Sequence, residues 1–249
     1  MWRDVRALAV FSVLGGAAAG CAPSVSDLDT GPLTSTFAVS DHFMPGGFVG
    51  DATTPGTLGV QVNQGCRPRP LGARGNCYVF TYHMKQGATD PFAGMFWLFP
   101  GNNWGSSPGR AIDTTKFRQI RFSAAVEAPT PSPANGANVF LTTQAGGIDP
   151  STLGDPSLAH ADAFKLVGEA QLGTDIGPDL KTFHLPIDDS ARAANCSSPD
   201  ALCVNGSAGA LIGAFGWVMP YPTAADATGT TPVKVYLDDI VWDTEPAPL

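Results

Sequence analysis

The stretch Cys77-Tyr78-Val79-Phe80-Thr81-Tyr82-His83 decides the fold of this chain. Its aromatic residues occupy every second position, and smaller or more polar residues stand between them. Side chains of a β-strand point alternately to the two faces of a sheet, so this period of two predicts a strand with one face against a core. The stretch Gln119-Ile120-Arg121-Phe122 alternates in the same way and predicts a second such strand.

Apolar segments of strand length recur outward from these two stretches. The expected strands are Thr36–Val39, Leu58–Val62, Cys77–His83, Ala93–Phe99, Arg118–Ala124, Asn138–Thr143, Ala163–Gln171, Lys181–Ile187, Leu211–Met219 and Val233–Trp242. Proline- and glycine-rich breakers separate them, among them Pro45-Gly46-Gly47, Pro129–Pro133 and Pro220-Tyr221-Pro222. No segment keeps a helical period. About ten short strands without helices predict an all-β, antiparallel β-sandwich of the jelly-roll type.

The N-terminus carries a secretion signal that ends at a cysteine. Arg3 and Arg6 precede the apolar run Ala7–Leu14, and small residues lead from there to Cys21. This order of regions is typical of a secretory signal peptide, and the apolar run is too short to span a bilayer. The ending Ala-Ala-Gly-Cys resembles a bacterial lipoprotein signal, in which the Cys21 thiol is acylated. An ordinary signal peptide that happens to contain a cysteine is the alternative.

We therefore expect four segments. Residues 1–20 are the signal peptide, 21–35 a flexible tether, 36–243 the β-sandwich and 244–249 a C-terminal tail. The expected location is the bacterial cell envelope, lipid-anchored at the outer membrane or cell surface. Ala22 rather than Asp follows the cysteine, which in the sorting rule of enterobacteria resembles an outer-membrane destination.

Four further cysteines fit an oxidising compartment. Four cysteines allow three pairings, and we expect the two local ones, Cys66–Cys77 and Cys196–Cys203, because each pair brackets a stretch rich in turn-forming residues. A zinc site is the alternative, but it needs ligand spacings that this chain lacks.

The charge of the chain limits its partners. The formal net charge is −8 at pH 7, which argues against nucleic acid and against an anionic membrane surface. We expect a monomer that contacts the membrane only through its lipid.

Three motifs carry a resemblance to a known group. They are Phe43-Met44-Pro45-Gly46-Gly47-Phe48-Val49-Gly50-Asp51, then Phe92–Gly105, and finally Phe215–Met219 with Val233–Trp242. Together they resemble carbohydrate-binding-module-like proteins with the galactose-binding-like β-sandwich, in which a last strand of the form aromatic-Leu-Asp-Asp-Ile closes the sheet. Region 144–162 departs from that group because it is longer and rich in Pro and Asp.

The resemblance implies a structural calcium ion. An aspartate of the closing strand commonly helps to bind it beside an N-terminal loop, which here would place Asp238 or Asp239 near Asp51. Carboxylates and free carbonyls are the hard oxygen ligands that calcium takes. Because strand alternation sends Asp238 and Asp239 to opposite faces, at most one of them can serve. The alternative is a polar strand end with a salt bridge.

The resemblance also implies a glycan partner held on aromatic side chains. The candidate platforms are Trp97, Phe99, Trp104, Trp217 and Tyr221, with Asn102 and Asn103 as partners for sugar hydroxyls. Trp97 and Trp217 stand in apolar strands and are more typical of a core than of a binding platform. Trp104 stands in a loop, where a plug over the end of the sandwich is the alternative to a binding role.

No sequence motif in this chain supports an enzymatic function. In Gly105-Ser106-Ser107-Pro108-Gly109, the residue after Ser107 has no backbone N–H for an oxyanion hole. No acid/base pair is marked out by the three glutamates (Glu127, Glu169, Glu245) or by the many aspartates. No metal-ligand spacing is present among the four histidines (His42, His83, His160, His184).

We expect carbohydrate binding without cleavage. An envelope lipoprotein with a structural or interaction role and no sugar site is the alternative, and a glycan-active hydrolase comes third.

The anchor is directly testable. The substitution Cys21→Ala removes the thiol to which lipid would be attached, so the variant should lose acylation and move from the detergent phase to the aqueous phase. Mass spectrometry of the N-terminal peptide and detergent partitioning measure both changes. Unchanged partitioning of the variant would show that Cys21 carries no anchor.

Overall fold

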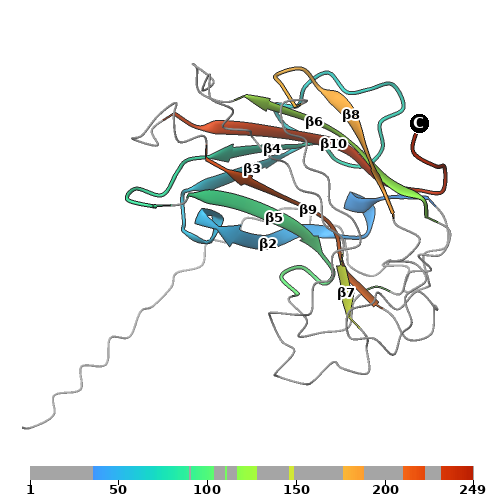
Figure 1. The fold of residues 1–249 in the computed structure, drawn as a ribbon, viewed down its shortest axis with the longest axis horizontal. Coiled ribbons are helices and arrows are strands. Elements are labelled where there is room, and N and C mark those ends of the chain that lie inside the picture. Colours follow the sequence, from blue (N-terminus) through green and yellow to red (C-terminus); the bar gives the residue numbers. More distant parts are fainter. Residues whose placement is uncertain are drawn as a thin grey trace, which may run out of the picture.

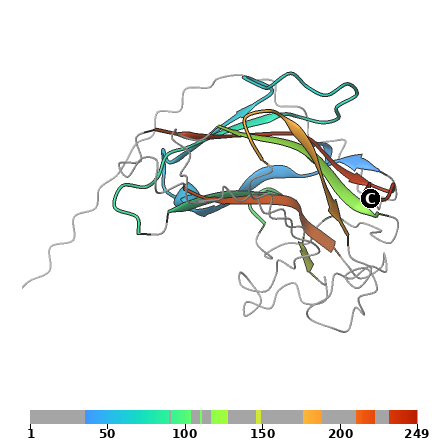
Figure 2. The ribbon, with the colours of Figure 1, turned by 45° about the horizontal axis from the view of Figure 1, so that its top comes forward.

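The computed structural model describes residues 36–89, 91–103, 110, 117–127, 146–148, 176–187, 210–221 and 231–248. These residues form two antiparallel sheets stacked face to face, as the layers in Figures 1 and 2 show, which confirms the predicted all-β sandwich. Within these ranges the helical pieces are two short 3-10 turns, η2 (Val39–Asp41) and η3 (Asp51–Thr53). A search of the same ranges for a helix long and apolar enough to cross a membrane finds none.

The larger sheet has the strand order β3-β4-β10-β6-β8, and β1 also pairs with β10. Its strands are β1 (Phe37–Ala38), β3 (Leu58–Val62), β4 (Tyr78–Tyr82), β6 (Gln119–Glu127), β8 (Lys181–Pro186) and β10 (Val233–Asp243). The smaller sheet has the order β2-β5-β9-β7. Its strands are β2 (Met44–Gly50), β5 (Phe92–Leu98), β7 (Gly146–Ile148) and β9 (Ala210–Pro220).

The core lies between the two sheets and is rich in aromatic rings. As predicted, Tyr78, Phe80 and Tyr82 of β4 face inward. The Phe80 ring meets the rings of Trp97 and Trp217 from the opposite sheet, with centroids 5.9 and 4.9 Å away. Edge-on contacts of this kind add to the free energy gained by burying the rings.

The positions of the strands confirm most of the sequence prediction and correct one part. Pro45-Gly46-Gly47, expected to be a breaker, lies inside strand β2. β2 is an edge strand, where a missing N–H can be tolerated, and the register shifts between Pro45 and Gly47 to accommodate the break. The strands expected at 138–143 and 163–171 lie outside the described residues.

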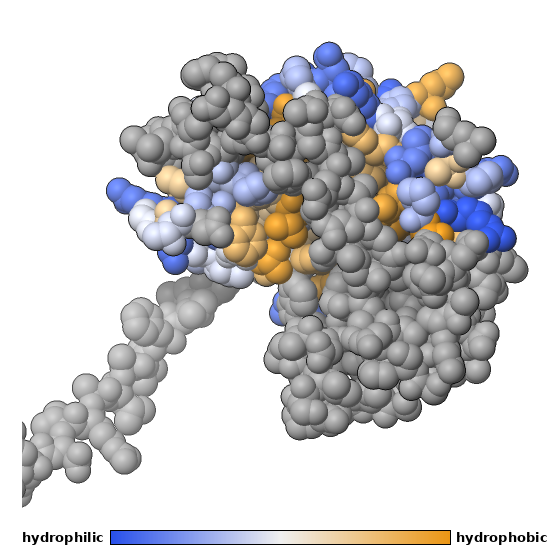
Figure 3. Space-filling view, in the orientation of Figure 1, coloured by the Kyte–Doolittle hydropathy of each residue, from blue (hydrophilic) through white to orange (hydrophobic). Residues whose placement is uncertain are grey.

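The outer face of the smaller sheet is apolar. Phe96 lies over Gly216, where an added Cβ would come within 2.4 Å of the Phe96 ring. Phe92 is 39% exposed at the start of the same strand. Figure 3 looks onto this side of the molecule, where hydrophobic colours gather over β5.

A two-residue irregularity interrupts β10 at Asp238 and Asp239. Asp238 pairs with Ser123, but the next pair is Val241 with Arg121. Asp239 has a φ of 50°, in the left-handed region that Asp tolerates better than most residues. The irregularity lets Leu237 and Ile240 both face the core, whereas strict alternation would turn one of them outward.

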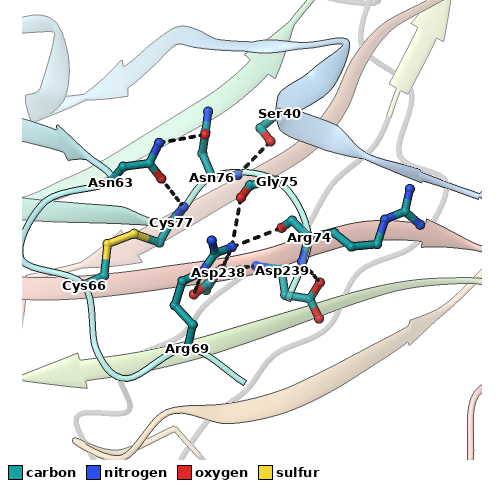
Figure 4. Close-up of a disulfide and its surroundings, with 10 residues drawn as sticks. All are labelled: Ser40, Asn63, Cys66, Arg69, Arg74, Gly75, Asn76, Cys77, Asp238 and Asp239. Atoms are coloured by element: carbon teal, nitrogen blue, oxygen red, sulfur yellow. Dashed lines mark hydrogen bonds and ion pairs between the residues drawn. A yellow bond between two sulfur atoms is a disulfide. The ribbon is translucent and has the colours of Figure 1, made fainter. Parts of the chain in front are cut away.

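A disulfide-closed strap, residues 63–77, crosses the outer face of the larger sheet (Figure 4). It confirms the predicted Cys66–Cys77 pair, whose Cα atoms are 6.2 Å apart. Asn63 Oδ1 accepts a hydrogen bond from the Cys77 N–H at 3.1 Å, and the Asn76 N–H donates to Ser40 Oγ at 2.9 Å. The other predicted pair, Cys196–Cys203, lies outside the described residues.

Arginines fix the strap to the irregularity in β10. The Arg69 guanidinium donates to both oxygens of Asp238, from Nε at 2.9 Å and from Nη2 at 2.7 Å. The Arg74 N–H donates to Asp239 Oδ1 at 2.8 Å, and Arg121 pairs with the other oxygen of Asp239. Both aspartate side chains are 4% exposed. A carboxylate this deeply buried is stable only with a cation and hydrogen-bond donors beside it.

Removing Arg69 should therefore destabilise the protein strongly. We expect Arg69→Ala to lower the free energy of unfolding by about 2–4 kcal/mol, because it leaves the buried Asp238 carboxylate without a countercharge. Urea unfolding measures the difference. The matched control is Arg67→Ala in the same strap: Arg67 pairs with Glu127, whose side chain is 39% exposed, so the expected loss is about 1 kcal/mol or less. Equal losses in the two variants would contradict the assignment.

Candidate functional site

A groove opens along one side of the sandwich, between the edge strands β2 and β3. It has a volume of about 490 Å³ and is open to solvent. Phe48 of β2 forms one wall, Leu58 of β3 the other, and turn η3 with the residues after it lies between them. The lining residues are Phe48, Ala52, Thr53, Thr54, Pro55, Gly56, Leu58 and Asn102.

The groove combines apolar surface with uncharged polar groups. Phe48 of the edge strand β2 is 42% exposed. Thr53, Thr54 and Asn102 line the same groove, and the Thr53 hydroxyl donates a hydrogen bond to the Gly50 carbonyl at 2.8 Å. None of the described lining residues is charged. Such a surface suits a neutral ligand that carries both C–H faces and hydroxyl groups.

A buried aspartate holds the floor of the groove in place. Asp51, the first residue of η3, accepts hydrogen bonds at Oδ2 from the Tyr82 hydroxyl and from the Lys85 N–H, both at 2.9 Å. The single O–H of Thr57 is shared between the backbone carbonyls of Asp51 and Thr54, the latter at 2.8 Å. These bonds tie η3 to strand β4 and to the loop that follows it.

The position of Tyr82, buried and bonded to Asp51, also changes the pKa of its hydroxyl. Burial, and then the hydrogen bond to the Asp51 carboxylate, raise the pKa of Tyr82 far above its ordinary value of 10.0. Tyr82 therefore stays a neutral donor to Asp51 throughout the physiological range of pH.

Gly50 is required where β2 turns into η3. It has a φ of 63°, and an added Cβ would lie 2.3 Å from the backbone oxygen of Phe92. Only glycine combines that dihedral angle with so close an approach. The chain can then turn sharply after Phe48, which sets η3 beside the exposed ring.

Most of the predicted sugar-binding residues do not meet at this groove. Trp97 and Tyr221 are 0% and 2% exposed, so their rings pack in the core and offer no face to a surface ligand, which corrects the prediction for both. Asn103 is also buried, at 2% exposed. Asn102 does line the groove. Trp104 lies outside the described residues.

The predicted calcium site, which would join Asp51 to Asp238 or Asp239, is not formed by these side chains. Asp51 is held by Tyr82 and Lys85 on the inner side of the sandwich, and Asp238 and Asp239 bind arginines on the outer side of β10. With protein donors directed at these carboxylates, the arrangement does not fit a shared cation. Among the described residues, no group of three His, Cys, Asp or Glu side chains could hold a metal.

Sequence reasoning missed Phe48, Thr53 and Thr54. Phe48 stands inside one of the motifs that carry the resemblance, but its neighbours Gly46 and Gly47 predicted a break instead of a strand. The available signal was an aromatic residue between glycines, followed closely by Thr-Thr-Pro-Gly.

Comparisons with known proteins find likeness in structure only. No protein-family model matches the sequence, and no curated protein matches it. The solved structures that are similar over most of the chain include the following two. One is the Caldicellulosiruptor saccharolyticus module CBM27-1 in complex with mannohexaose, with 12% identity, 86% of this chain and 99% of that chain covered, and a TM-score of 0.44. The other is the family 11 carbohydrate-binding module of the cellulosomal cellulase Lic26A-Cel5E of Clostridium thermocellum, with 12% identity, 82% and 98% covered, and a TM-score of 0.35.

The bond between Tyr82 and Asp51 makes a prediction for stability. Tyr82→Phe should lower the free energy of unfolding by about 1–2 kcal/mol at neutral pH, because a buried carboxylate loses a donor. Tyr236→Phe is the control, since its hydroxyl donates to the partly exposed Glu127; the expected cost is smaller.

The pH dependence has a definite sign. Because folding raises the pKa of Tyr82, its contribution is fully present below the unfolded value of about pH 10 and is lost as the pH rises above it. The wild type should therefore lose more stability than Tyr82→Phe between about pH 9 and pH 11 in urea unfolding. An identical loss in both proteins would contradict the assigned role of Tyr82.

Proposed function

We propose that this protein binds a neutral polysaccharide in the groove between β2 and β3, without cleaving it. The exposed ring of Phe48, in a groove that the polar residues Thr53, Thr54 and Asn102 also line, is the observation that supports this proposal. An aromatic face packs against the C–H face of a pyranose, and the neighbouring polar groups exchange hydrogen bonds with the sugar hydroxyls.

The absence of charge among the described groove residues favours a neutral sugar. Acidic sugars are usually met by Arg or Lys, which form charge-assisted hydrogen bonds. Binding by stacking and neutral hydrogen bonds should change little with salt, because few charges are screened. The same residues include no carboxylate, and glycoside hydrolysis needs a pair of them.

The proposal includes the location of the protein. A chain acylated at Cys21 would present the sandwich from the bacterial envelope on the tether of residues 21–35. A surface-held module of this kind would keep polysaccharide close to the cell.

Replacing the exposed ring tests the binding site. Phe48→Ala should weaken binding of soluble neutral hexose polysaccharides roughly 5- to 150-fold, which corresponds to about 1–3 kcal/mol for an anchoring aromatic residue. Phe48→Tyr keeps the ring and should bind like the wild type, whereas Phe48→Leu keeps apolar volume without a ring and should bind weakly. Leu71→Ala is the control, because Leu71 is fully exposed on the strap and outside the groove.

Affinity electrophoresis and isothermal titration calorimetry measure the affinities, and near-UV circular dichroism checks that each variant is folded. Equal affinity of wild type and folded Phe48→Ala would exclude this groove as the site. No binding by the wild type to any neutral polysaccharide would favour the structural or interaction lipoprotein instead. Release of new reducing ends would move the protein to the hydrolases.

A further inference from the structure

The free edge of strand β3 is unusual for a sheet edge. In the described part of the chain β3 pairs only with β4, so its other edge is open. Its sequence Leu58-Gly59-Val60-Gln61-Val62 contains neither a charge nor a proline. Natural sheet edges are normally protected by lysine, proline, a bulge or a cover, because an open edge invites another strand to pair.

Three other described strands at sheet edges carry such protection: β7, for example, is only three residues long and has a register shift against β9. β2 contains Pro45 and the register shift after it. β8 begins with Lys181 and ends with Pro186. β3 has neither device, and its pairing with β4 runs without a register shift.

The backbone of β3 shows which groups face the open edge. Just outside the strand, the His83 N–H donates to the Thr57 carbonyl at 2.7 Å and the Asn63 N–H to the Cys77 carbonyl at 2.9 Å. The bonds to β4 therefore fall on the odd-numbered residues, from 57 to 63. Since the direction of the backbone groups alternates along a strand, Leu58, Val60 and Val62 point their N–H and C=O groups away from β4.

We propose that β3 pairs with β3 of a second copy of this chain, antiparallel and about a two-fold axis at Val60. The outward-facing residues are the first, the middle and the last of the strand, so this register places Val60 opposite Val60 and Leu58 opposite Val62. Each of these pairs brings together residues whose N–H and C=O groups both face the partner, as an antiparallel hydrogen-bonded pair requires. A strand pair with this symmetry closes on itself as a dimer.

The side chains fit the same register. Val62 is 41% exposed in one copy, and the pairing would set it beside Leu58 of the partner on the inner side of the sheet, where both are apolar. On the outer side, Gly59 would lie opposite Gln61, and an added Cβ at Gly59 finds no atom closer than 3.9 Å. The chain has a net charge of −8, which would oppose contact between two copies at most of its surface. Strand β3 carries no charged residue, so two copies can meet there without placing like charges side by side. From the sequence we expected a monomer; the direction of the backbone groups along β3 can be seen only in the structure.

A backbone substitution tests the pairing. Val60→Pro removes an N–H that faces the open edge and leaves the bonds between β3 and β4 in place. The control is Val60→Ala, which removes the same side chain and keeps the N–H. We expect the wild type and Val60→Ala to show a concentration-dependent monomer–dimer equilibrium in sedimentation velocity, and Val60→Pro to stay monomeric at every concentration.

A second variant guards against a fold defect in the first. Val62→Lys places a charge on the exposed part of the edge and should raise the dimer dissociation constant at least tenfold, whereas Val62→Thr should raise it much less. Phe48→Ala should dimerise like the wild type, which separates this inference from the glycan proposal. A wild type that is monomeric at all concentrations, or a folded Val60→Pro that still dimerises, would overturn it.

Discussion

The buried Asp238 carboxylate is the constraint on which the outer side of the larger sheet depends. It lies at an irregularity of the central strand β10, with 4% of its side chain exposed, and Arg69 satisfies both of its oxygens. Arg69 belongs to the strap, so the charge requirement of β10 fixes the strap across the sheet. The Cys66–Cys77 bond then closes a loop whose course is already determined by ion pairs. That face is thereby covered, and the groove and the open edge lie elsewhere.

Asp238 and Asp51 are both buried carboxylates that need stabilising partners, and the partners differ. Asp238 is neutralised by a cation, whereas Asp51 is stabilised by neutral donors, a tyrosine hydroxyl and a backbone N–H. The first solution holds a surface strap. The second holds the turn between the two sheets and leaves the neighbouring groove free of charge. Both carboxylates accept hydrogen bonds from protein groups, whereas the resemblance implied that these positions would bind calcium.

The segment from Phe48 to Val62 carries both surfaces that we propose to be functional. Side chains from Phe48 to Leu58 line the groove, whereas the open edge offers the backbone groups of Leu58, Val60 and Val62. The two surfaces use different atoms, although they adjoin at Leu58. They coexist because β2 and β3 are the edge strands on the same side of the sandwich, joined by the turn that Asp51 holds.

The sequence by itself determined the fold class, the inward face of β4 and the Cys66–Cys77 pair, because alternation and short loop closure are local properties. It did not determine β2, where local glycine and proline signals predicted a break that an edge position tolerates. Nor could it tell that Tyr221 is buried and Phe48 exposed, because burial depends on which strands stack against one another. The pairing of Arg69 with Asp238 joins residues 169 positions apart, and the open edge of β3 follows from strand order. Only the tertiary structure decided these features, since each arises from contacts between segments that are distant in the chain.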